Sequence, residues 1–235
     1  DPDFRERFAQ EVDLARSARG RGIPRVFDAD TSAEIPWLAT EYVMGPSLQH
    51  LVDTAGPLPE PSAVHLARGI AQALTDLHAQ GLAHRDLKPA NVMIAPTGPQ
   101  VIDFGIARAM ADTHRPDNAG TVGTPGYMAP EIIRGRQSGP PVDVFAFGAV
   151  LVFALTGTGP FGDGHPSSVL FRADKVGPDL SGVPESLRPL AAACLDRDPV
   201  KRPTAAQVLH ALGGPVVPAP AASTWLPPTA VVVVD

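Results

Sequence analysis

Four polar residues stand close together in the middle of the chain: Asp86, Lys88, Asn91 and Asp103. Asn91 and Asp103 offer amide and carboxylate oxygens, which Mg²⁺ takes as ligands, usually one or two beside nucleotide phosphates. The Asp86 carboxylate suits a group that accepts a hydrogen bond from an attacking hydroxyl and orients it. Lys88 reaches a transferred phosphoryl group as a point charge. Because phosphoryl transfer needs mainly positioning and charge neutralisation, these residue types fit that chemistry.

These residues belong to three short motifs. His84 to Asn91 reads H-R-D-L-x-x-x-N, residues 103–105 read D-F-G, and Gly123 to Glu131 reads G-T-P-G-Y-M-A-P-E. Each tripeptide alone is a weak signal, but together, in this order and spacing, they indicate a protein kinase. Small-molecule kinases of the aminoglycoside or choline type share an H-x-D-x-x-x-x-N followed by an Asp. They are not expected to carry the A-P-E segment.

Composition excludes several other classes. The 235 residues carry a formal net charge of −6 and no long basic run, so no nucleic-acid partner is expected. The single Cys194 excludes an internal disulfide and a cysteine-rich zinc site, and its apolar surroundings predict a small buried side chain. The longest apolar run, Val142 to Leu155, is too short to span a bilayer and predicts a core helix. A membrane anchor beyond residue 235 of the full gene product stays open.

Hydrophobic spacing and capping signals predict the elements that position the motifs. A T-x-x-Q capping box opens the last helix, and Ser47 caps a short one. His78 is interpreted as a helix-end residue in favourable contact with the helix dipole. The predicted elements are a helix over 2–19, strands over 25–29 and 37–43, helices over 48–54, 59–80, 142–155 and 204–212, and a mostly disordered linker over 215–235.

From about Phe4 to Leu212 the chain resembles the bacterial serine/threonine protein kinases of eukaryotic (Hanks) type. Lys88-Pro89 and the G-T-P-G-Y segment favour serine or threonine over tyrosine as acceptor. The resemblance implies an α+β, protein kinase-like fold with a mostly helical large lobe. It divides the chain into a partial small lobe (1–44), a large lobe (45–213) and a Pro/Ala-rich linker (214–235). It also implies ATP with Mg²⁺ as cofactors, protein substrates bearing Ser or Thr, and a cytoplasmic kinase domain.

The resemblance assigns the nucleotide side of the site. Glu11 corresponds to the glutamate of helix C that pairs with a strand lysine, although the spacing alone favours a place at the solvent-facing edge of its helix. Thr40 corresponds to the gatekeeper, and Glu41 and Val43 to the hinge whose backbone bonds the adenine. With Asn91 and Asp103 these form the expected nucleotide-binding set.

It also assigns supporting and regulatory roles. Arg85 is the expected receptor for a phosphate on the activation segment, where Thr113 and Thr121 are the candidate phosphorylation sites. Thr124 is expected to shape the acceptor pocket and contact Asp86 and Lys88. His84 is expected to pack and form hydrogen bonds under the loop, and Glu131 is expected to form an ion pair with Arg202. Asp143 is expected to support the catalytic-loop backbone; a simple N-terminal dipole role is the alternative.

The chain departs from the family pattern at its start. It has three lysines, none of them before Lys88, and no G-x-G-x-x-G ahead of a strand. We therefore expect a fragment that lacks the Gly-rich loop, the first three strands of the small lobe and the lysine partner of Glu11. Such a fragment should bind nucleotide weakly. The alternative to an enzyme is a non-catalytic pseudokinase or scaffold. The intact Asp86, Lys88, Asn91 and Asp103 favour the enzyme.

Overall fold

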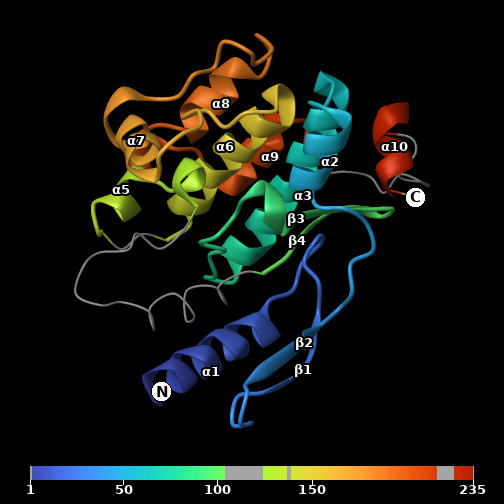
Figure 1. Cartoon of the computed structure of the whole chain (residues 1–235), viewed down its shortest axis with the longest axis vertical. Helices are drawn as coiled ribbons and strands as arrows, with labels where there is room; N and C mark the ends of the chain where they lie inside the picture. Colours follow the sequence, from blue (N-terminus) through green and yellow to red (C-terminus); the bar gives the residue numbers. More distant parts are fainter. Residues whose placement is uncertain (1, 104–123, 137–138, 216–224, 235) are drawn as a thin grey trace.

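The computed structural model of the chain describes residues 2–103, 124–136, 139–215 and 225–234. The structure is mostly helical with a few strands (Figure 1). Helix α1 (Pro2–Ser17) and the hairpin of β1 (Val26–Asp30) and β2 (Trp37–Thr40) lie at one end. The larger helical part begins after residue 45 and holds most of the buried core.

The N-terminal part is held by a small apolar cluster and by guanidinium groups. Phe8 and Val12 of α1 are buried against Ala29 and Leu38 of the hairpin. The strands pair antiparallel, with a bulge between Val26 and Asp28. The Arg5 side chain donates to three backbone carbonyls of the hairpin turn, at distances of 2.6–3.2 Å: Thr31, Ala33 and Glu34. The helix predicted over 2–19 is confirmed and ends at Ser17.

The larger part is built around α3 (Glu60–Ala79) and α6 (Pro141–Thr156). The predicted apolar stripe of α3 is buried, including Leu66, Ile70 and Leu74. Every residue of α6 from Val142 to Leu155 is buried, as expected for a helix that is apolar all round. Among the described residues, no helix has the length and apolar character needed to cross a lipid bilayer.

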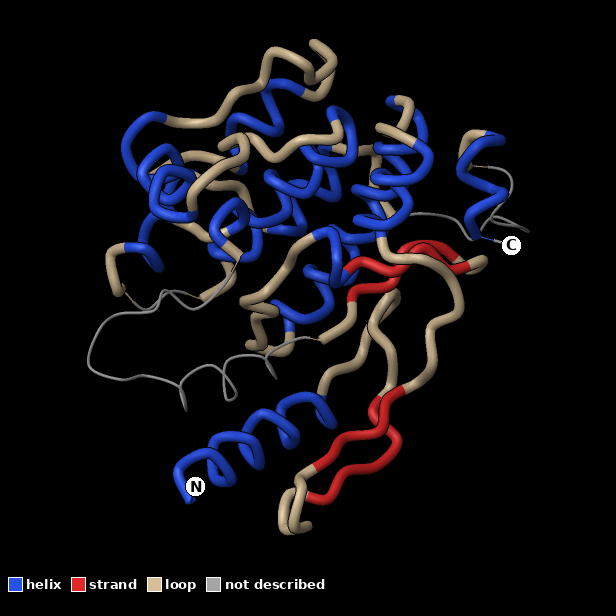
Figure 2. Tube along the Cα trace, in the orientation of Figure 1, coloured by secondary structure: helices blue, strands red, loops and turns tan. Residues whose placement is uncertain are grey.

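Shorter elements surround these two helices (Figure 2). Ser47 accepts a hydrogen bond from the His50 amide and caps α2, as predicted. Gly98 and Pro99 open strand β4, so the hairpin turn between β3 and β4 is only two residues long. The remaining bounds are α2 Leu48–Ala55, β3 Val92–Ala95, β4 Gly98–Val101, α5 Pro130–Ile133, α7 Pro166–Phe171, α8 Arg188–Cys194, α9 Ala205–Ala211 and α10 Pro228–Val234.

Two local predictions in the last third of the chain are confirmed. Thr204 and Gln207 form a reciprocal capping box at the start of α9. Cys194 is buried at the end of α8, and burial raises the pKa of its thiol to about 12. This cysteine is therefore a packing residue, because its thiolate, the reactive form, is suppressed.

The prediction of a mostly disordered linker over 215–235 was wrong for residues 225–234. These residues form a turn and helix α10, and Leu226 and Ala230 are buried in the main core. The physical reason is packing: Leu226 and Ala230 join the main apolar core and α10 contacts α2, a gain in buried apolar surface that composition alone does not reveal.

Candidate active site

The catalytic loop, residues 84–91, is fixed from beneath by Asp143. This fully buried carboxylate in the first turn of α6 accepts the backbone N–H of His84 at 2.8 Å and that of Arg85 at 2.7 Å. His78 Nε2 lies 2.8 Å from the same carboxylate. The expected support of the loop by Asp143 is confirmed. The contact of His78 was missed, because its place near the end of α3 gave no sign that α6 would pack there.

His84 joins the loop to the segment that leads to Asp103. Its ring is fully buried, and burial lowers its pKa. Since the Asp86 amide donates to Nδ1 at 3.2 Å, the proton of the neutral ring is on Nε2, which donates to the Ile102 carbonyl at 2.9 Å. The expected hydrogen bonding of His84 under the loop is therefore confirmed, and the neutral ring is suited to structure rather than to proton transfer.

Two side-chain donors converge on Asp86. Lys88 Nζ lies 2.7 Å from Oδ2, and Asn91 Nδ2 lies 3.0 Å from the same oxygen and 2.9 Å from the Asp86 carbonyl. This fixes the rotamer of the carboxylate, and within the described part of the chain Oδ1 accepts no hydrogen bond and is left for another donor. The Asp86 side chain is 17% exposed, so an incoming hydroxyl could reach it while most bulk water is excluded.

Backbone strain also marks the site. Among the described residues other than glycine, positive φ angles occur at Arg85 (65°) and Asp103 (59°). Each such residue costs about 1–3 kcal/mol and persists only where its surroundings fix it. Arg85 is fixed by Asp143. Asp103 follows Ile102, whose N–H donates to the Asn91 carbonyl at 2.9 Å. These bonds bring Asp103 beside Asn91, as the metal-ligand hypothesis requires.

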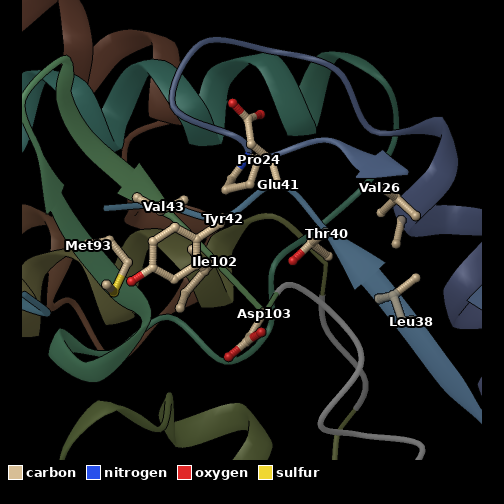
Figure 3. A pocket seen from close by; sticks show the side chains of 11 residues that line it. Pro24, Val26, Leu38, Thr40, Glu41, Tyr42, Val43, Met93, Ile102 and Asp103 are labelled. Carbon is tan, nitrogen blue, oxygen red and sulfur yellow. The ribbon is translucent and has the colours of Figure 1, made fainter. Parts of the chain in front are cut away.

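A cavity of about 280 Å³ opens between the N-terminal hairpin and the larger part (Figure 3). Its walls include the three residues expected at the adenine, Thr40, Glu41 and Val43, and Asp103 stands at its edge. Sequence reasoning had not selected several apolar lining residues, although alternation along the strands would have found some of them. These additional residues are Ala15, Pro24, Val26, Leu38, Tyr42, Met93 and Ile102.

A second, smaller cavity of about 30 Å³ is lined by Asp86 itself. Arg85, Thr124 and Tyr127 are among its other lining residues. Arg85 and Thr124 are both exposed at this cavity. The structure thus places Thr124, expected to shape the acceptor pocket, and Asp86 around one opening.

Glu131 and Arg202 form the ion pair that the sequence predicted. The two guanidinium nitrogens bond the two carboxylate oxygens at 2.6 and 2.7 Å, and both side chains are almost fully buried. Arg202 also donates to the Asp196 and Pro141 carbonyls and lies over the Phe145 ring. Four of the five N–H donors of the guanidinium are therefore matched, in a place where an unpaired charge would be costly.

Several expected residues lie outside what the structure describes. These are Phe104 and Gly105 of the D-F-G motif, Thr113 and Thr121 of the activation segment, and the side chain of Glu11. Their expected roles stay predictions.

Comparison with known proteins decides the family. The model of the protein kinase domain matches residues 1–212. The chain belongs to the protein kinase domain family. The family uses ATP and phosphorylates proteins.

Relatives in actinobacteria are similar over most of the chain. It is 42% identical to the serine/threonine-protein kinase AfsK of Streptomyces coelicolor over 99% of its length, and 37% identical to PknB of Mycobacterium tuberculosis over 86%. It spans only 30% and 34% of those proteins. Among solved structures, Rad53 1-466 in complex with AMP-PNP superposes with a TM-score of 0.74 at 25% identity, covering 87% of this chain and 53% of that one.

The residues present fit a magnesium–nucleotide complex. Both acceptors around Asn91 Nδ2 belong to Asp86, so the amide nitrogen must face Asp86 and the amide oxygen points away from it. That oxygen and the Asp103 carboxylate are hard donors of the kind Mg²⁺ prefers. Within the described ranges no group of three or more His, Cys, Asp or Glu residues could hold a metal. A two-ligand site completed by phosphates agrees with that finding.

Proposed function

We propose that the protein transfers the γ-phosphate of ATP to Ser or Thr hydroxyls of protein substrates. The observation that carries this proposal is the Asp86 carboxylate, fixed by Lys88 and Asn91 on a loop that Asp143 holds from beneath. Such a carboxylate accepts the hydrogen bond of the attacking hydroxyl and directs its oxygen at the phosphorus. Lys88, bonded to the same carboxylate, neutralises charge that develops on the phosphoryl oxygens.

The cavity is proposed as the adenine site. The Glu41 amide already donates to the Arg25 carbonyl at 2.7 Å, which leaves the Glu41 carbonyl and the Val43 amide as the hinge groups for the base. Apolar side chains such as Met93 and Ile102 form the other wall and exclude water. Rad53, with a similar fold, is described in complex with AMP-PNP, which supports a nucleotide in this fold.

Asn91 and Asp103 are proposed to hold Mg²⁺. The ion, when bound, neutralises phosphate charge between the nucleotide and the loop. Asn91 then has two functions at once, because its amide nitrogen orients Asp86 and its amide oxygen faces the metal. Asp103 owes its position to the left-handed backbone conformation that Ile102 and His84 maintain.

The protein is further proposed to be regulated through its activation segment. Arg85 would receive a phosphate on Thr113 or Thr121, and Thr124 would contact Asp86 and Lys88 when a protein substrate docks. The exposed guanidinium of Arg85 beside the loop supports this arrangement. Mass spectrometry of active gene product that finds no phosphate between residues 106 and 124 would refute it.

We also propose how the N-terminal residues relate to the family fold. Helix α1 would correspond to helix C, strands β1 and β2 to the fourth and fifth strands of the small lobe, and residues 1–44 and 45–213 to the two lobes. The chain has no lysine before Lys88 that could pair with Glu11 and no G-x-G-x-x-G ahead of a strand. The nucleotide affinity of residues 1–235 alone should therefore be low. The kinase domain is proposed to work in the cytoplasm, where ATP is supplied.

Phosphoryl transfer by the whole gene product tests this proposal. With labelled ATP and a generic protein acceptor, Asp86→Asn should lower the rate about 10²–10⁴-fold, the range for loss of a positioned acid–base group. Acid hydrolysis of the product should yield phosphoserine or phosphothreonine.

The matched control is Asp53→Asn, which removes an exposed carboxylate on α2 and should leave the rate unchanged. If the wild-type protein transfers no phosphate while it folds and binds ATP, the non-catalytic scaffold replaces the enzyme. Phosphotyrosine as the main product would overturn the assigned acceptor.

A further inference from the structure

One face of α3 holds the end of the chain through a row of three polar residues. Ser62, His65 and Arg68 follow at intervals of three, so they lie along one side of the helix. Each contacts the C-terminal segment, and none of them belongs to the active site described above. This row is called the α3 polar row below.

The α3 polar row binds the C-terminal chain at two places. Arg68 donates to the carbonyls of Gly214 and Pro215, both at 2.8 Å, just after α9. Further along, the His65 ring stacks on Trp225, with ring centroids 4.6 Å apart and an interplanar angle of 18°. Ser62, which is only 5% exposed, donates its hydroxyl to the Trp225 carbonyl. The backbone and the indole of Trp225 are therefore both recognised.

Beyond Trp225 the segment packs on α2. Leu226 is 6% exposed and Ala230 is fully buried, and both belong to the same core cluster as Leu48 and Leu51 of α2. Figure 1 shows α10 beside α2, and the two helices are in contact. The neighbouring Thr229 is exposed, so α10 turns one definite face to the protein.

Helix α2 is directly connected to the wall of the nucleotide cavity. The Pro46 carbonyl just before it accepts the Ile94 amide at 2.8 Å, and Ser47 forms a β-bridge with Met93. Met93 lines the cavity. Whatever steadies α2 therefore also steadies the strand that forms one wall of that cavity.

We propose that residues 225–234 are a strap, an intramolecular ligand of the α3 polar row and of α2, and that its docking supports α2 and the cavity wall behind it. The occupant of this surface is the chain's own C-terminal segment. The chemistry of the segment matches the surface that binds it. The Trp225 indole stacks on the imidazole of His65, and the Trp225 carbonyl accepts the hydroxyl of Ser62. The apolar side chains of Leu226 and Ala230 share a core cluster with the leucines of α2. The proposal rests on packing and holds whether or not the protein transfers phosphate.

Trp225 itself reports docking. The chain has two tryptophans, so in a Trp37→Phe background Trp225 is the only indole. Ala230→Asp puts a carboxylate into the buried face of α10, whereas Thr229→Asp puts the same group on its exposed face. We expect Ala230→Asp to shift Trp225 emission to longer wavelength and to raise acrylamide quenching at least threefold. Thr229→Asp should change neither. Equal quenching in the two variants would overturn the docking.

Amide hydrogen exchange tests the support of α2. In the Ala230→Asp chain, amides of α2 should exchange at least tenfold faster than in Thr229→Asp, with no change in α6 and α9. Unchanged exchange in α2 would overturn the support. An equal rise in α6 and α9 would also overturn it, because the substitution would then act on the whole fold.

Discussion

The catalytic loop and the N-terminal region hold their residues in opposite ways. The loop is fixed by a carboxylate that is 0% exposed, Asp143, within the most buried helix of the chain. The N-terminal region relies on a small cluster around Phe8 and Val12 and on the half-buried guanidinium of Arg5 at the hairpin turn. It also leaves large apolar side chains in water: Phe27 is 68% exposed, and Ile35, Trp37, Tyr42 and Met44 are exposed as well.

The two regions carry different parts of the proposed phosphoryl-transfer site. The groups proposed to orient a hydroxyl and neutralise a phosphoryl group are built into the larger buried core. The groups proposed to enclose the nucleotide on the other side stand on a region with little buried surface of its own. Since buried apolar area supplies most of the stability of a fold, we expect the N-terminal region to unfold first.

The largest effect should follow from removing Arg202. Arg202→Ala leaves Glu131 buried without its partner, which costs about 3–5 kcal/mol of unfolding free energy. Urea unfolding followed by circular dichroism should show the loss. Lys201→Ala, at the exposed neighbouring position, should show none. A midpoint equal to that of the wild type would contradict the role given to this ion pair.

Removing Asp143 should come next. Asp143→Ala takes the acceptor from the amides of His84 and Arg85, and we expect a loss of about 2–4 kcal/mol from two unsatisfied donors. The positive φ of Arg85 would lose its main restraint, so phosphoryl transfer by the whole gene product should fall as well. If the variant kept wild-type activity, the loop would owe its geometry to something other than α6.

A smaller and local loss is expected for Arg5→Ala. Without three hydrogen bonds to the hairpin turn, the N-terminal region should lose about 1–2 kcal/mol. Trp37 fluorescence in a Trp225→Phe background should detect this, while circular dichroism of the helical core should not. Arg25→Ala, which removes an exposed arginine side chain of the same region, serves as the control. An equal shift of both signals would mean that the two regions unfold together.

The smallest effect is a pH dependence of the strap. Burial and the nearby Arg68 lower the pKa of His65 below its ordinary value of 6.5. A histidine whose pKa is depressed in the docked state favours docking when neutral, so docking is strongest above pH 6.5 and weakens as the pH falls through that value. Acrylamide quenching of Trp225 should therefore rise below pH 6.5, and His65→Gln should remove the dependence.

Much of the site could be predicted from the sequence because its chemistry is local. Asp86, Lys88 and Asn91 lie within six residues, and their mutual bonds follow from that spacing. The pairs of Asp143 with the loop and of Glu131 with Arg202 are far apart in sequence, and the family resemblance, not periodicity, predicted them. The contact of His78 with Asp143 was missed, since nothing local indicates which buried carboxylate a helix-end imidazole will meet.

The C-terminal segment is the part of the fold that the sequence predicted wrongly. Its Pro, Ala and Val content with almost no charge predicted disorder, yet Leu226 and Ala230 are buried. The information that fixes this segment lies in its receptor, the α3 polar row and the leucines of α2. The composition of the segment describes only the segment itself and not the surface of α3 and α2 that binds it.

The most direct test of the difference between the regions is a pair of urea titrations on the 235-residue chain. Trp225→Phe leaves Trp37 as the reporter of the N-terminal region, and circular dichroism reports the helical core. We predict that the Trp37 transition comes at a clearly lower urea concentration than the loss of helix. Coincident transitions would instead show one cooperative unit and would contradict the account.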